Sequence, residues 1–427
     1  MRVLILSTYD FDGGASRAAY RLHCALTDLA VESHMLVYNK FTYDHSVIGP
    51  KNRFELGLNL IRPHLDQLPL RLYPGRERST WSTSLFPNGI EKKIARLDPD
   101  LIHIHWAGFG FLPIGSLARL RKPVVWTLHD MWPFTGGCHY AGACTGYVGR
   151  CGHCPQLGSR SVHDLSRWIM AKKRTHWRMK EIVVVSPSRW LADCARSSSL
   201  FSQSRIEVIP NPIDLKVYKT IDKAVARDLL NLPREGKIVL FVAINARQEP
   251  RKGYAKLSAC LESLVQVYPS RDLTMLVAGT GSPEEPEMPC RAHYLGRLHD
   301  DFSMVLAYSA ADVFVAPSLQ ENLPNTIMEA MACGTPCVAF DIGGIPDIVG
   351  HRVDGYLARP FDAADLAKGV AWMLESGERR VQMGENARTK IESFGARDMV
   401  VEKHLDLYRE ILSRTQTNGN ESTENNR

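Results

Sequence analysis

The sequence lacks any uninterrupted apolar run of the roughly 18–20 residues that a membrane-spanning helix needs, and it shows no internal repeat. Its N-terminus, MRVLILSTYDFDGG, has one basic residue and a short apolar stretch that ends in an acidic, glycine-rich turn, which does not fit a signal peptide. We interpret this stretch as a first β-strand. The sequence therefore predicts a cytoplasmic protein without a membrane span.

A concentrated basic stripe of the kind that binds nucleic acid is also missing, because the net charge is only +6 over 427 residues. We therefore expect no nucleic-acid partner. Between residues 161 and 180, however, Trp168, Ile169 and Trp177 are interleaved with positive charges. These charges are Arg167, Lys172, Lys173, Arg174, Arg178 and Lys180. The segment is either a solvated helix face or a docking face for anionic lipid headgroups, which would place the protein peripherally at the inner face of the plasma membrane.

The chain is too long for one hydrophobic core, since cores stop growing near about 250–300 residues. Short β-branched runs alternate with helix-period segments, a pattern that predicts an α/β architecture of parallel sheets covered by helices on both faces. The series starts at Val3–Ser7 and restarts at Ile238–Ala243, so we predict two domains, residues 1–215 and 216–395. The other expected strands are Met35–Tyr38, Leu101–His105, Val124–Leu128, Ile182–Val185, Glu207–Ile209, Leu273–Ala278, Asp312–Ala316 and Pro336–Phe340.

Three further segments stand outside this alternation. Residues 43–88 lack clean periodicity and predict a loop or a helical excursion beyond the sheet. Residues 396–414 predict a C-terminal helix that crosses back to the N-terminal domain. Residues 415–427 contain no aliphatic or aromatic side chain and predict a disordered tail.

Gly13 and Gly14 lie between the first expected strand and an expected helix over Ala15–Leu29. A backbone without side chains can approach an anion at such a turn, and the helix N-terminus adds unpaired N–H groups and a positive dipole end. A structural turn explains the pair equally well, because the G-x-G-x-x-G spacing of a dinucleotide-binding loop is absent.

Two pairs of charged residues follow strands of the second domain. Arg247 and Lys252 share one loop at the carboxyl end of a parallel strand, where α/β sheets bind ligands and where a diphosphate would suit two cations. Glu321 and Glu329, spaced E-x7-E, flank the expected start of a helix. Taken alone, the cations also fit ordinary surface charge, and the acids also fit the favourable position of negative charge at a helix N-terminus.

His129 follows the expected strand Val124–Leu128 directly. A lone histidine is more often structural, but a position at the end of a parallel strand favours a functional role.

Together these residues carry a family resemblance. Arg247, Lys252, Glu321-x7-Glu329, the run EAMACGTPCVAFDIGGIPDIV from Glu329 to Val349, and Asp354-Gly355-Tyr356 resemble family-four retaining glycosyltransferases of the GT-B fold. The resemblance reaches the first domain through Gly13-Gly14, His129-Asp130, Ser186–Arg189 and Asn211–Asp214. It implies two Rossmann-like domains facing each other across a cleft, and transfer of a hexose from a nucleotide diphosphate sugar with retention at the anomeric carbon.

The resemblance also implies roles for individual residues. Arg247 and Lys252 would hold the donor diphosphate and neutralise charge on the leaving group, so no catalytic metal is expected. Glu321 and His129 would face the donor sugar, and Glu329 would bind the ribose hydroxyls. The backbone N–H groups that complete the phosphate site would be those of Asn325 and Thr326, with Gly13 and Gly14 as further nucleotide-sugar contacts.

Four cysteines form a separate pattern, C-x5-C-x6-C-x2-C, within a glycine-rich insert at residues 136–158. They are Cys138, Cys144, Cys151 and Cys154. In a reducing cytoplasm this spacing is typical of a structural zinc site, with His139 and His153 as substitute ligands, and free or redox-active thiols are the alternative. The insert resembles one in family members that serve exopolysaccharide and lipopolysaccharide assembly. That implies a glycan or lipid-linked oligosaccharide acceptor in bacterial surface polysaccharide biosynthesis.

Three other functions agree with parts of the sequence. A zinc-stabilised nucleic-acid-binding protein would use the cysteines and the basic segment but would leave the charged residues of the second domain without a role. An inactive GT-B scaffold or glycan-binding protein would keep the fold without turnover. A GT-B epimerase or phosphorylase would differ in its products. The intact set of charged residues favours the transferase.

Overall fold

A computed structural model describes residues 1–268, 272–279 and 288–424, the last ten of them as backbone only. The chain divides into two compact units, Met1–Pro210 with Asp398–Arg427 and Asn211–Arg397. We call them the N-terminal and the C-terminal unit. The division falls after Pro210, five residues before the boundary at residue 215 that the sequence analysis expected.

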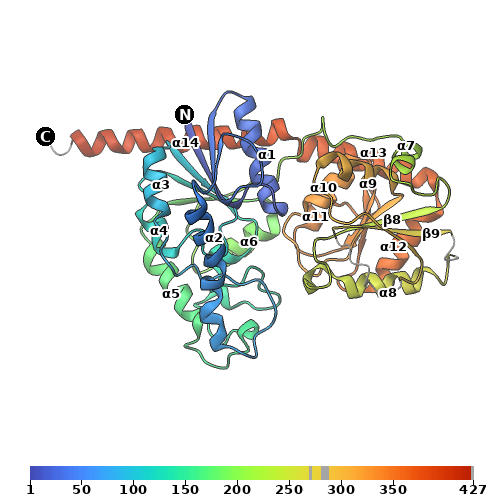
Figure 1. The fold of residues 1–427 in the computed structure, drawn as a ribbon, viewed down its shortest axis with the longest axis horizontal. Helices are drawn as coiled ribbons and strands as arrows, with labels where there is room; N and C mark the ends of the chain where they lie inside the picture. The colour runs from blue at the N-terminus through green and yellow to red at the C-terminus, as the bar shows by residue number, and fades with distance from the viewer. Residues whose placement is uncertain (269–271, 280–287, 425–427) are drawn as a thin grey trace. The chain divides into compact units, whose positions relative to one another are not determined.

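The N-terminal unit is built on a seven-stranded sheet of order β3-β2-β1-β4-β5-β6-β7 (Figure 1). Every neighbouring pair of strands in it is parallel. The strands are β1 (Arg2–Tyr9), β2 (Glu32–Asn39), β3 (Val47–Ile48), β4 (Leu101–Ile104), β5 (Val124–Thr127), β6 (Ile182–Ser186) and β7 (Ile206–Val208). Its main helices, besides a C-terminal one, are α1 (Gly14–Asp28), α2 (Arg53–Gln67), α3 (Ile90–Leu97), α4 (Ile114–Arg119), α5 (Leu165–Trp177) and α6 (Arg189–Ser197).

The alternation of side chains along β1 explains why helices cover both faces of this sheet. Val3 and Ile5 point to one face and pack in the same apolar cluster as residues of α1. Leu4 and Leu6 point to the other face and belong to a cluster that includes residues of α3, α5 and α6. A strand buried on both faces needs apolar residues at every position, which is why the β-branched runs were readable from the sequence.

The C-terminal unit repeats the plan with a six-stranded parallel sheet of order β10-β9-β8-β11-β12-β13. Its strands are β8 (Lys237–Val242), β9 (Leu273–Ala278), β10 (Arg291–Tyr294), β11 (Val313–Ala316), β12 (Cys337–Phe340) and β13 (Gly355–Ala358). Its helices are α7 (Lys223–Leu229), α8 (Tyr254–Leu264), α9 (Asp301–Ala310), α10 (Asn325–Ala332), α11 (Ile345–Ile348), α12 (Ala363–Glu375) and α13 (Gly377–Phe394). The predicted α/β architecture of two Rossmann-like domains is confirmed.

The last helix, α14 (Arg397–Glu424), belongs almost entirely to the N-terminal unit. Tyr408 donates or accepts a 2.6 Å hydrogen bond with Nδ1 of His103 on β4. Arg205 donates two hydrogen bonds to the carboxylate of Glu410, at 2.7 and 2.8 Å. The sequence analysis expected disorder after residue 414, but the helix continues through residues 415–424. The physical reason is that extending a helix that is already formed costs far less than starting one. Residues 425–427 of the expected tail lie outside the described residues.

Among the helices in the described ranges, we find none with the length and apolar character needed to cross a bilayer.

Four histidines from the β4 and β5 strand regions and from α14 form a cluster, in which His103, His105 and His404 are buried and His129 is partly exposed. Besides its contact with Tyr408, His103 shares a 2.7 Å hydrogen bond with Oγ1 of Thr127 through Nε2. Nδ1 of His105 lies 2.9 Å from Nε2 of His129, and the ring of His404 packs against that of His103. Burial lowers the pKa of His129 to about 4, against the opposing charge of Asp130, and lowers the pKa of His404 to about 3. These imidazoles are therefore neutral in the folded protein at pH 7.

This cluster predicts that the folded state loses stability in mild acid. A histidine whose folded pKa is depressed contributes fully above its unfolded pKa of about 6.5, and that contribution is lost as the pH falls toward the folded pKa, by up to about 1.4 kcal/mol per pH unit for each such histidine. We expect the unfolding temperature to fall between pH 7 and pH 5, and to fall less in His404→Gln. The exposed His299 provides the matched control, since His299→Gln should keep the wild-type slope. Equal slopes in all three proteins would contradict this account.

Candidate functional site

The order of the C-terminal sheet reverses between β8 and β11, because the chain moves outward from β8 to β9 and β10 and then returns to the other side. In open α/β sheets, ligands bind at the carboxyl ends of the strands at such a point. The loop after β8 carries Arg247 and Lys252, and the loop after β11 carries Glu321. The predicted residues of this unit therefore flank the place where the fold favours ligand binding.

Glu321 is the centre of an ionic cluster at this point. Nζ of Lys252 donates to its Oε1 at 2.6 Å, Nη1 of Arg251 lies 2.9 Å from the same oxygen, and the hydroxyl of Ser318 donates to it at 3.1 Å. Only 6 % of Glu321 is exposed. Burial alone would raise the pKa of this carboxyl, but the charges of Arg251 and Lys252 outweigh it and lower the pKa to about 2. Glu321 is therefore a carboxylate throughout the physiological pH range.

Two glycines bring the neighbouring loops against this cluster. Gly253 has φ +71°, and a Cβ there would lie 1.8 Å from the carbonyl oxygen of Pro317, at the end of β11. Gly343, after β12, has φ +54°, and its Cβ would lie 2.0 Å from the carbonyl oxygen of Glu321. The N–H of Gly344 donates to that same oxygen at 3.2 Å. Loops from β8, β11 and β12 thus meet at Glu321 because these positions carry no side chain.

Arg251, and not the expected Arg247, joins Lys252 in the ionic cluster around Glu321. The Arg247 side chain is exposed, and its guanidinium carbon lies 5.2 Å from the centre of the Tyr254 ring. Arg251, which the sequence analysis did not single out, binds Glu321 instead and also donates to the carbonyl oxygen of Gln320 at 2.9 Å. The feature of the sequence that could have indicated a role for Arg251 is its position next to Lys252.

Glu329 does not share the partners of Glu321. It lies inside α10, almost fully buried, and its Oε2 accepts a 2.9 Å hydrogen bond from the hydroxyl of Tyr308 on α9. Burial, together with the charge of Glu329, raises the pKa of Tyr308 well above its usual value. At the start of α10, Oδ1 of Asn325 accepts a 2.8 Å hydrogen bond from Asn211, while Thr326 is partly exposed.

In the N-terminal unit, the sheet order reverses between β1 and β4, and Gly13 and Gly14 follow β1 directly. Gly13 has φ +88° at the N-cap of α1, and a Cβ there would meet no atom within 4 Å. The position therefore requires glycine for its backbone conformation and not for lack of space. The adjoining Gly14 is exposed at the first residue of the helix.

His129 follows β5, is partly exposed and is held through its Nε2 by His105. The next residue, Asp130, accepts hydrogen bonds of 2.6 Å from Nε1 of Trp106 and of 2.9 Å from the N–H of Trp132. Nδ1 of His139 lies 2.6 Å from the same carboxylate. Asp130 thereby fastens the start of the cysteine-rich insert beside His129.

The four cysteines of the insert line one small cavity, together with Trp81 and Gly136. All four are free thiols. Burial raises the pKa of Cys138, Cys151 and Cys154, with Cys151 at about 11, so these thiols are protonated when no cation is near. In the described residues, no group of three or more His, Cys, Asp or Glu side chains is arranged to hold a metal ion. The zinc site therefore stays a prediction.

The two histidines considered as substitute zinc ligands have other partners. Nε2 of His139 lies 2.9 Å from the hydroxyl of Ser82, and its Nδ1 is engaged by Asp130. Nδ1 of His153 shares a 2.8 Å hydrogen bond with the carbonyl oxygen of Arg160.

The basic segment 161–180 contains α5, and part of it faces inward. Ile169, Lys173 and Trp177 are buried. Nζ of Lys173 donates to the carbonyl oxygens of Trp132 and Thr135, the latter at 3.0 Å, and burial lowers the pKa of this lysine to about 7. Lys173 thus ties α5 to the insert and is unavailable to lipid headgroups, whereas Trp168 is exposed.

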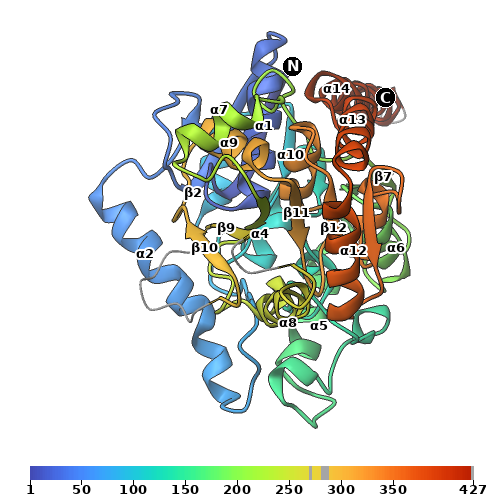
Figure 2. The same ribbon diagram turned by 90° about the vertical axis from the view of Figure 1, so that its right-hand side faces the viewer.

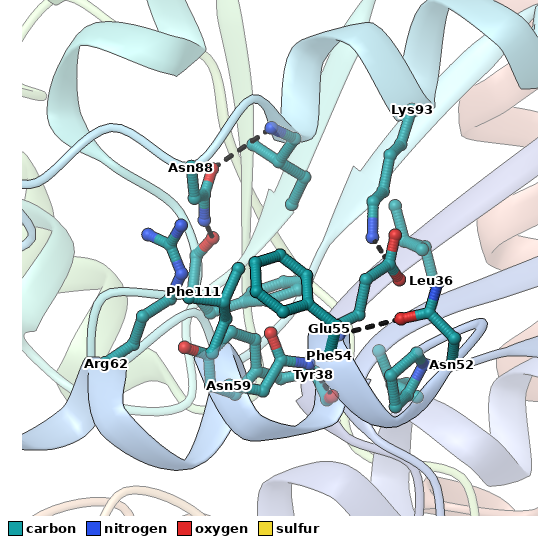
Figure 3. A pocket seen from close by; sticks show the side chains of 14 residues that line it. Leu36, Tyr38, Asn52, Phe54, Glu55, Asn59, Arg62, Asn88, Lys93 and Phe111 are labelled. Carbon is teal, nitrogen blue, oxygen red and sulfur yellow. Dashed lines mark hydrogen bonds and ion pairs between the residues drawn. The ribbon is translucent and has the colours of Figure 1, made fainter.

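A larger cavity, of about 320 Å³, opens between α2, the end of β2 and α3 (Figure 3). Phe54 and Leu58 border it on α2, and Tyr38 lines its floor. The hydroxyl of Tyr38 is buried and has no hydrogen-bond partner. The sequence analysis assigned no role to residues 43–88, which supply most of one wall.

Comparison with family descriptions covers nearly the whole chain. Residues 12–217 match "Glycosyltransferase Family 4", and residues 222–390 match "Glycosyl transferases group 1". The chain belongs to the family-four glycosyltransferases. The predicted hexosyltransferase-type enzyme is thereby confirmed at the level of the family.

Characterised relatives of this glycosyltransferase are moderately similar. D-inositol 3-phosphate glycosyltransferase 2 of Catenulispora acidiphila is 27 % identical over 333 residues, which cover 73 % of this chain and 71 % of the relative. Phosphatidyl-myo-inositol mannosyltransferase of Mycolicibacterium smegmatis is 28 % identical over 312 residues, which cover 71 % of this chain and 70 % of the relative.

Solved structures agree in fold. Sucrose-phosphate synthase of Thermosynechococcus elongatus superposes with a TM-score of 0.71 at 19 % identity, over 97 % of this chain and all of that chain. HepE of Anabaena, solved with UDP and glucose, gives a TM-score of 0.65 at 18 % identity, over 96 % of this chain and all of that one. These similarities support the GT-B fold.

The close approach at Gly253 yields a stability prediction. Gly253→Ala must relieve both the left-handed backbone and the contact with Pro317, so we expect a loss of about 1–3 kcal/mol in the free energy of unfolding. Gly75→Ala is the control, because Gly75 is not left-handed and has open space around it. It should change the unfolding free energy by less than about 0.5 kcal/mol in the same denaturant titration. Similar values for both variants would mean that the loops do not depend on Gly253.

Proposed function

We propose that this glycosyltransferase moves a sugar from a nucleotide diphosphate sugar to a glycan or lipid-linked oligosaccharide, with retention at the anomeric carbon, in bacterial surface polysaccharide biosynthesis. The cluster of Lys252, Arg251 and Glu321 at the sheet reversal carries this proposal. The similarity to HepE, which was solved with UDP, supports a nucleotide-linked donor.

The chemistry follows from the charges of this cluster. The donor diphosphate would bind Lys252 and Arg247, and these cations would offset the negative charge that develops on the leaving nucleotide, the task a metal ion performs in other transferases. Because Lys252 now binds Glu321 at 2.6 Å, the diphosphate would compete for the lysine and release the carboxylate to accept hydrogen bonds from the donor sugar. Glu321, fully ionised, would also stabilise an oxocarbenium-like transition state.

The remaining residues of the proposed donor site would position the substrate. Glu329 would accept hydrogen bonds from the ribose hydroxyls, with Tyr308 orienting its carboxylate. Asn325 and Thr326 would offer backbone N–H groups to the phosphates. The N-terminal unit would contribute Gly13 and Gly14 to nucleotide-sugar binding and neutral His129 as a hydrogen-bonding partner of the donor sugar.

The acceptor is proposed on two kinds of support. The cysteine-rich insert resembles that of enzymes acting on surface polysaccharides. One of the two relatives is named for a phosphatidylinositol acceptor, and lipid-linked acceptors are therefore compatible with this family. A cytoplasmic enzyme that uses such an acceptor would work at the inner membrane face, where the exposed Trp168 and the partly exposed Lys172 of segment 161–180 would contact anionic lipids.

This proposal predicts nucleotide binding by the wild-type protein and loss of sugar transfer in two variants. Without added metal, one of UDP, GDP or ADP should raise the unfolding temperature, since a ligand at about 100 times its dissociation constant stabilises by about 2.7 kcal/mol. Lys252→Ala and Glu321→Ala should each lower sugar transfer by about 100-fold or more, because charge stabilisation of a leaving group is worth several kcal/mol. Product analysis by mass spectrometry with the selected donor measures the transfer.

Lys219→Ala is the matched control, because Lys219 is an exposed lysine of the same unit. It should keep wild-type transfer. Unchanged transfer in the Lys252 and Glu321 variants would refute the site. Nucleotide binding without any transfer would instead indicate an inactive scaffold.

We further propose that Cys138, Cys144, Cys151 and Cys154 bind one structural zinc ion. They line a single cavity in a segment whose regular structure is limited to short 3-10 turns, and a metal would hold such a loop together. Binding would require the thiols to lose their protons.

Zinc content tests this assignment directly. The purified protein should contain about one zinc per chain by elemental analysis, and a double variant, Cys138→Ser with Cys154→Ser, should contain none. Cys260→Ser is the control, since Cys260 is buried far along the chain and outside the insert. Four thiols that react with a chromogenic reagent in metal-free native protein would overturn the zinc assignment.

A further inference from the structure

Two neutral histidines of the N-terminal unit share one hydrogen bond. Nδ1 of His105, the residue after β4, lies 2.9 Å from Nε2 of His129, which follows β5. Burial lowers the pKa of both imidazoles, so both are neutral at pH 7. A neutral imidazole carries one proton, so one of its nitrogens donates a hydrogen bond and the other accepts one. The contact can therefore form in two ways, which differ in which of the two histidines is the donor.

The other nitrogen of His105 distinguishes the two forms. Its Nε2 is buried, and it has no hydrogen-bond partner among the residues that the structure describes. If His129 were the donor, His105 would carry its proton on Nε2 and would bury an N–H group without an acceptor. If His105 is the donor, its Nε2 is an acceptor without a donor. Among backbone groups, buried donors without an acceptor are the rarer of the two, so the form in which His105 donates is favoured.

The space beside these rings is small. His105 and His129 both line a cavity of about 10 Å³. An ordered water needs about 10–15 Å³ or more and several polar partners. The cavity is therefore at the lower limit for a water that would accept a proton from Nε2, and the preference for donation by His105 stands.

An acid fixes the proton of the neighbouring His139, whereas Nε2 of His129 has an imidazole as its partner. Nδ1 of His139 lies 2.6 Å from Oδ2 of Asp130, and a carboxylate only accepts hydrogen bonds, so this nitrogen carries a proton. The same oxygen accepts from Nε1 of Trp106. The bond between His105 and His129 is therefore the contact that decides where the proton of His129 lies.

We propose that His105 fixes the tautomer of His129 by donating from Nδ1 to Nε2, so that His129 carries its proton on Nδ1. A hydrogen bond at one ring nitrogen determines which nitrogen is protonated. His129 then offers a donor, and not an acceptor, at Nδ1. This inference rests on the proposed function for one step only: the sugar atom that meets this nitrogen would be a hydroxyl oxygen that accepts a hydrogen bond. His105 is a positioning residue, because it acts on the sugar through His129.

The cluster also contains a histidine that serves as a matched comparison. Helix α14, seen from the side in Figure 1 and nearly end-on in Figure 2, contributes His404. His404 and His105 are each 3 % exposed. The ring of His404 packs against that of His103, with 5.3 Å between their centres. Replacing His404 therefore removes an equally buried histidine of the same cluster and leaves the bond between His105 and His129 in place.

Nitrogen NMR of the ligand-free full chain with isotope-labelled histidine tests the tautomer. The ring of His129, assigned by its loss in His129→Gln, should show a protonated Nδ1 and an unprotonated Nε2. His105→Leu removes the donor and should shift the proton of His129 toward Nε2. His105→Asn, whose side-chain amide can donate from the position of Nδ1, should keep the wild-type pattern, and so should His404→Gln. A protonated Nε2 on His129 in the wild type would overturn the proposal, as would an unchanged pattern in His105→Leu.

Kinetics then show whether this proton acts on the sugar. His105→Leu should lower kcat/KM for sugar transfer by about fivefold to tenfold, the loss expected for one hydrogen bond, and His105→Asn should recover most of it. The thermal shift with the nucleotide diphosphate alone should equal that of the wild type in both variants, because His129 would meet only the sugar. Weaker nucleotide binding in His105→Leu would indicate a general structural role and would overturn the proposal.

The two proposals fail in different measurements. The expected NMR pattern in a wild-type protein that transfers no sugar would support the tautomer and refute the proposed function. Transfer by the wild type that is equally fast in His105→Leu, with the tautomer of His129 changed, would support the proposed function and refute the role of His105 in it.

Discussion

The buried carboxylate of Glu321 organises the point at which the order of the C-terminal sheet reverses. Glu321 receives two cations and a hydroxyl on one side chain, while its carbonyl oxygen receives the N–H of Gly344. A charge this deeply buried is tolerable only when it is fully paired, since an unpaired one would cost several kcal/mol. The same pairing ties together loops that follow three strands, so the geometry of the whole reversal point depends on it. Under the proposed function, a donor diphosphate would meet a cluster that is already assembled and would replace Glu321 as the partner of Lys252.

In the N-terminal unit, a buried acid, Asp130, is likewise paired, here by hydrogen bonds from neighbouring loops. Asp130 collects Trp106, Trp132 and His139, and Lys173 caps the carbonyl oxygens that follow. These contacts fix the entry to the cysteine-rich insert, whose regular structure is limited to short 3-10 turns and whose Ala141, Cys154 and Leu157 join the main apolar cluster of the unit. His129 is held beside this anchor in its neutral form by burial. Insert and strand end thus form one structural element, so a change in either is expected to move the other.

The sequence predicted those features that depend on local pattern. Buried parallel strands show as apolar runs, so the central strands of both sheets were readable from the sequence. The edge strands β3, β10 and β13 were not predicted. The loops bearing Arg247, Lys252 and Glu321 were placed through family resemblance and strand ends. Pairings between distant residues were not accessible: nothing in the sequence indicates that Arg251 binds Glu321 or that Tyr308 binds Glu329. Helix α2 was expected only as a loop or helical excursion, because the side that contacts its own unit carries Glu55, Asn59 and Asp66, contrary to the apolar pattern by which helices are recognised.

The return of α14 to the N-terminal unit has a consequence for biosynthesis. Val400, Val401 and Tyr408 fill the same apolar cluster as Val3 and Ile5, so one face of the first sheet is completed by residues that are synthesised after the whole C-terminal unit. Domains usually fold in the order in which they leave the ribosome, at about 5–20 residues per second. Here the C-terminal unit, a continuous stretch from Asn211 to Arg397, is complete first. Until α14 is made, α1 covers only part of that face of the N-terminal sheet, and the remaining apolar surface is exposed to aggregation during translation.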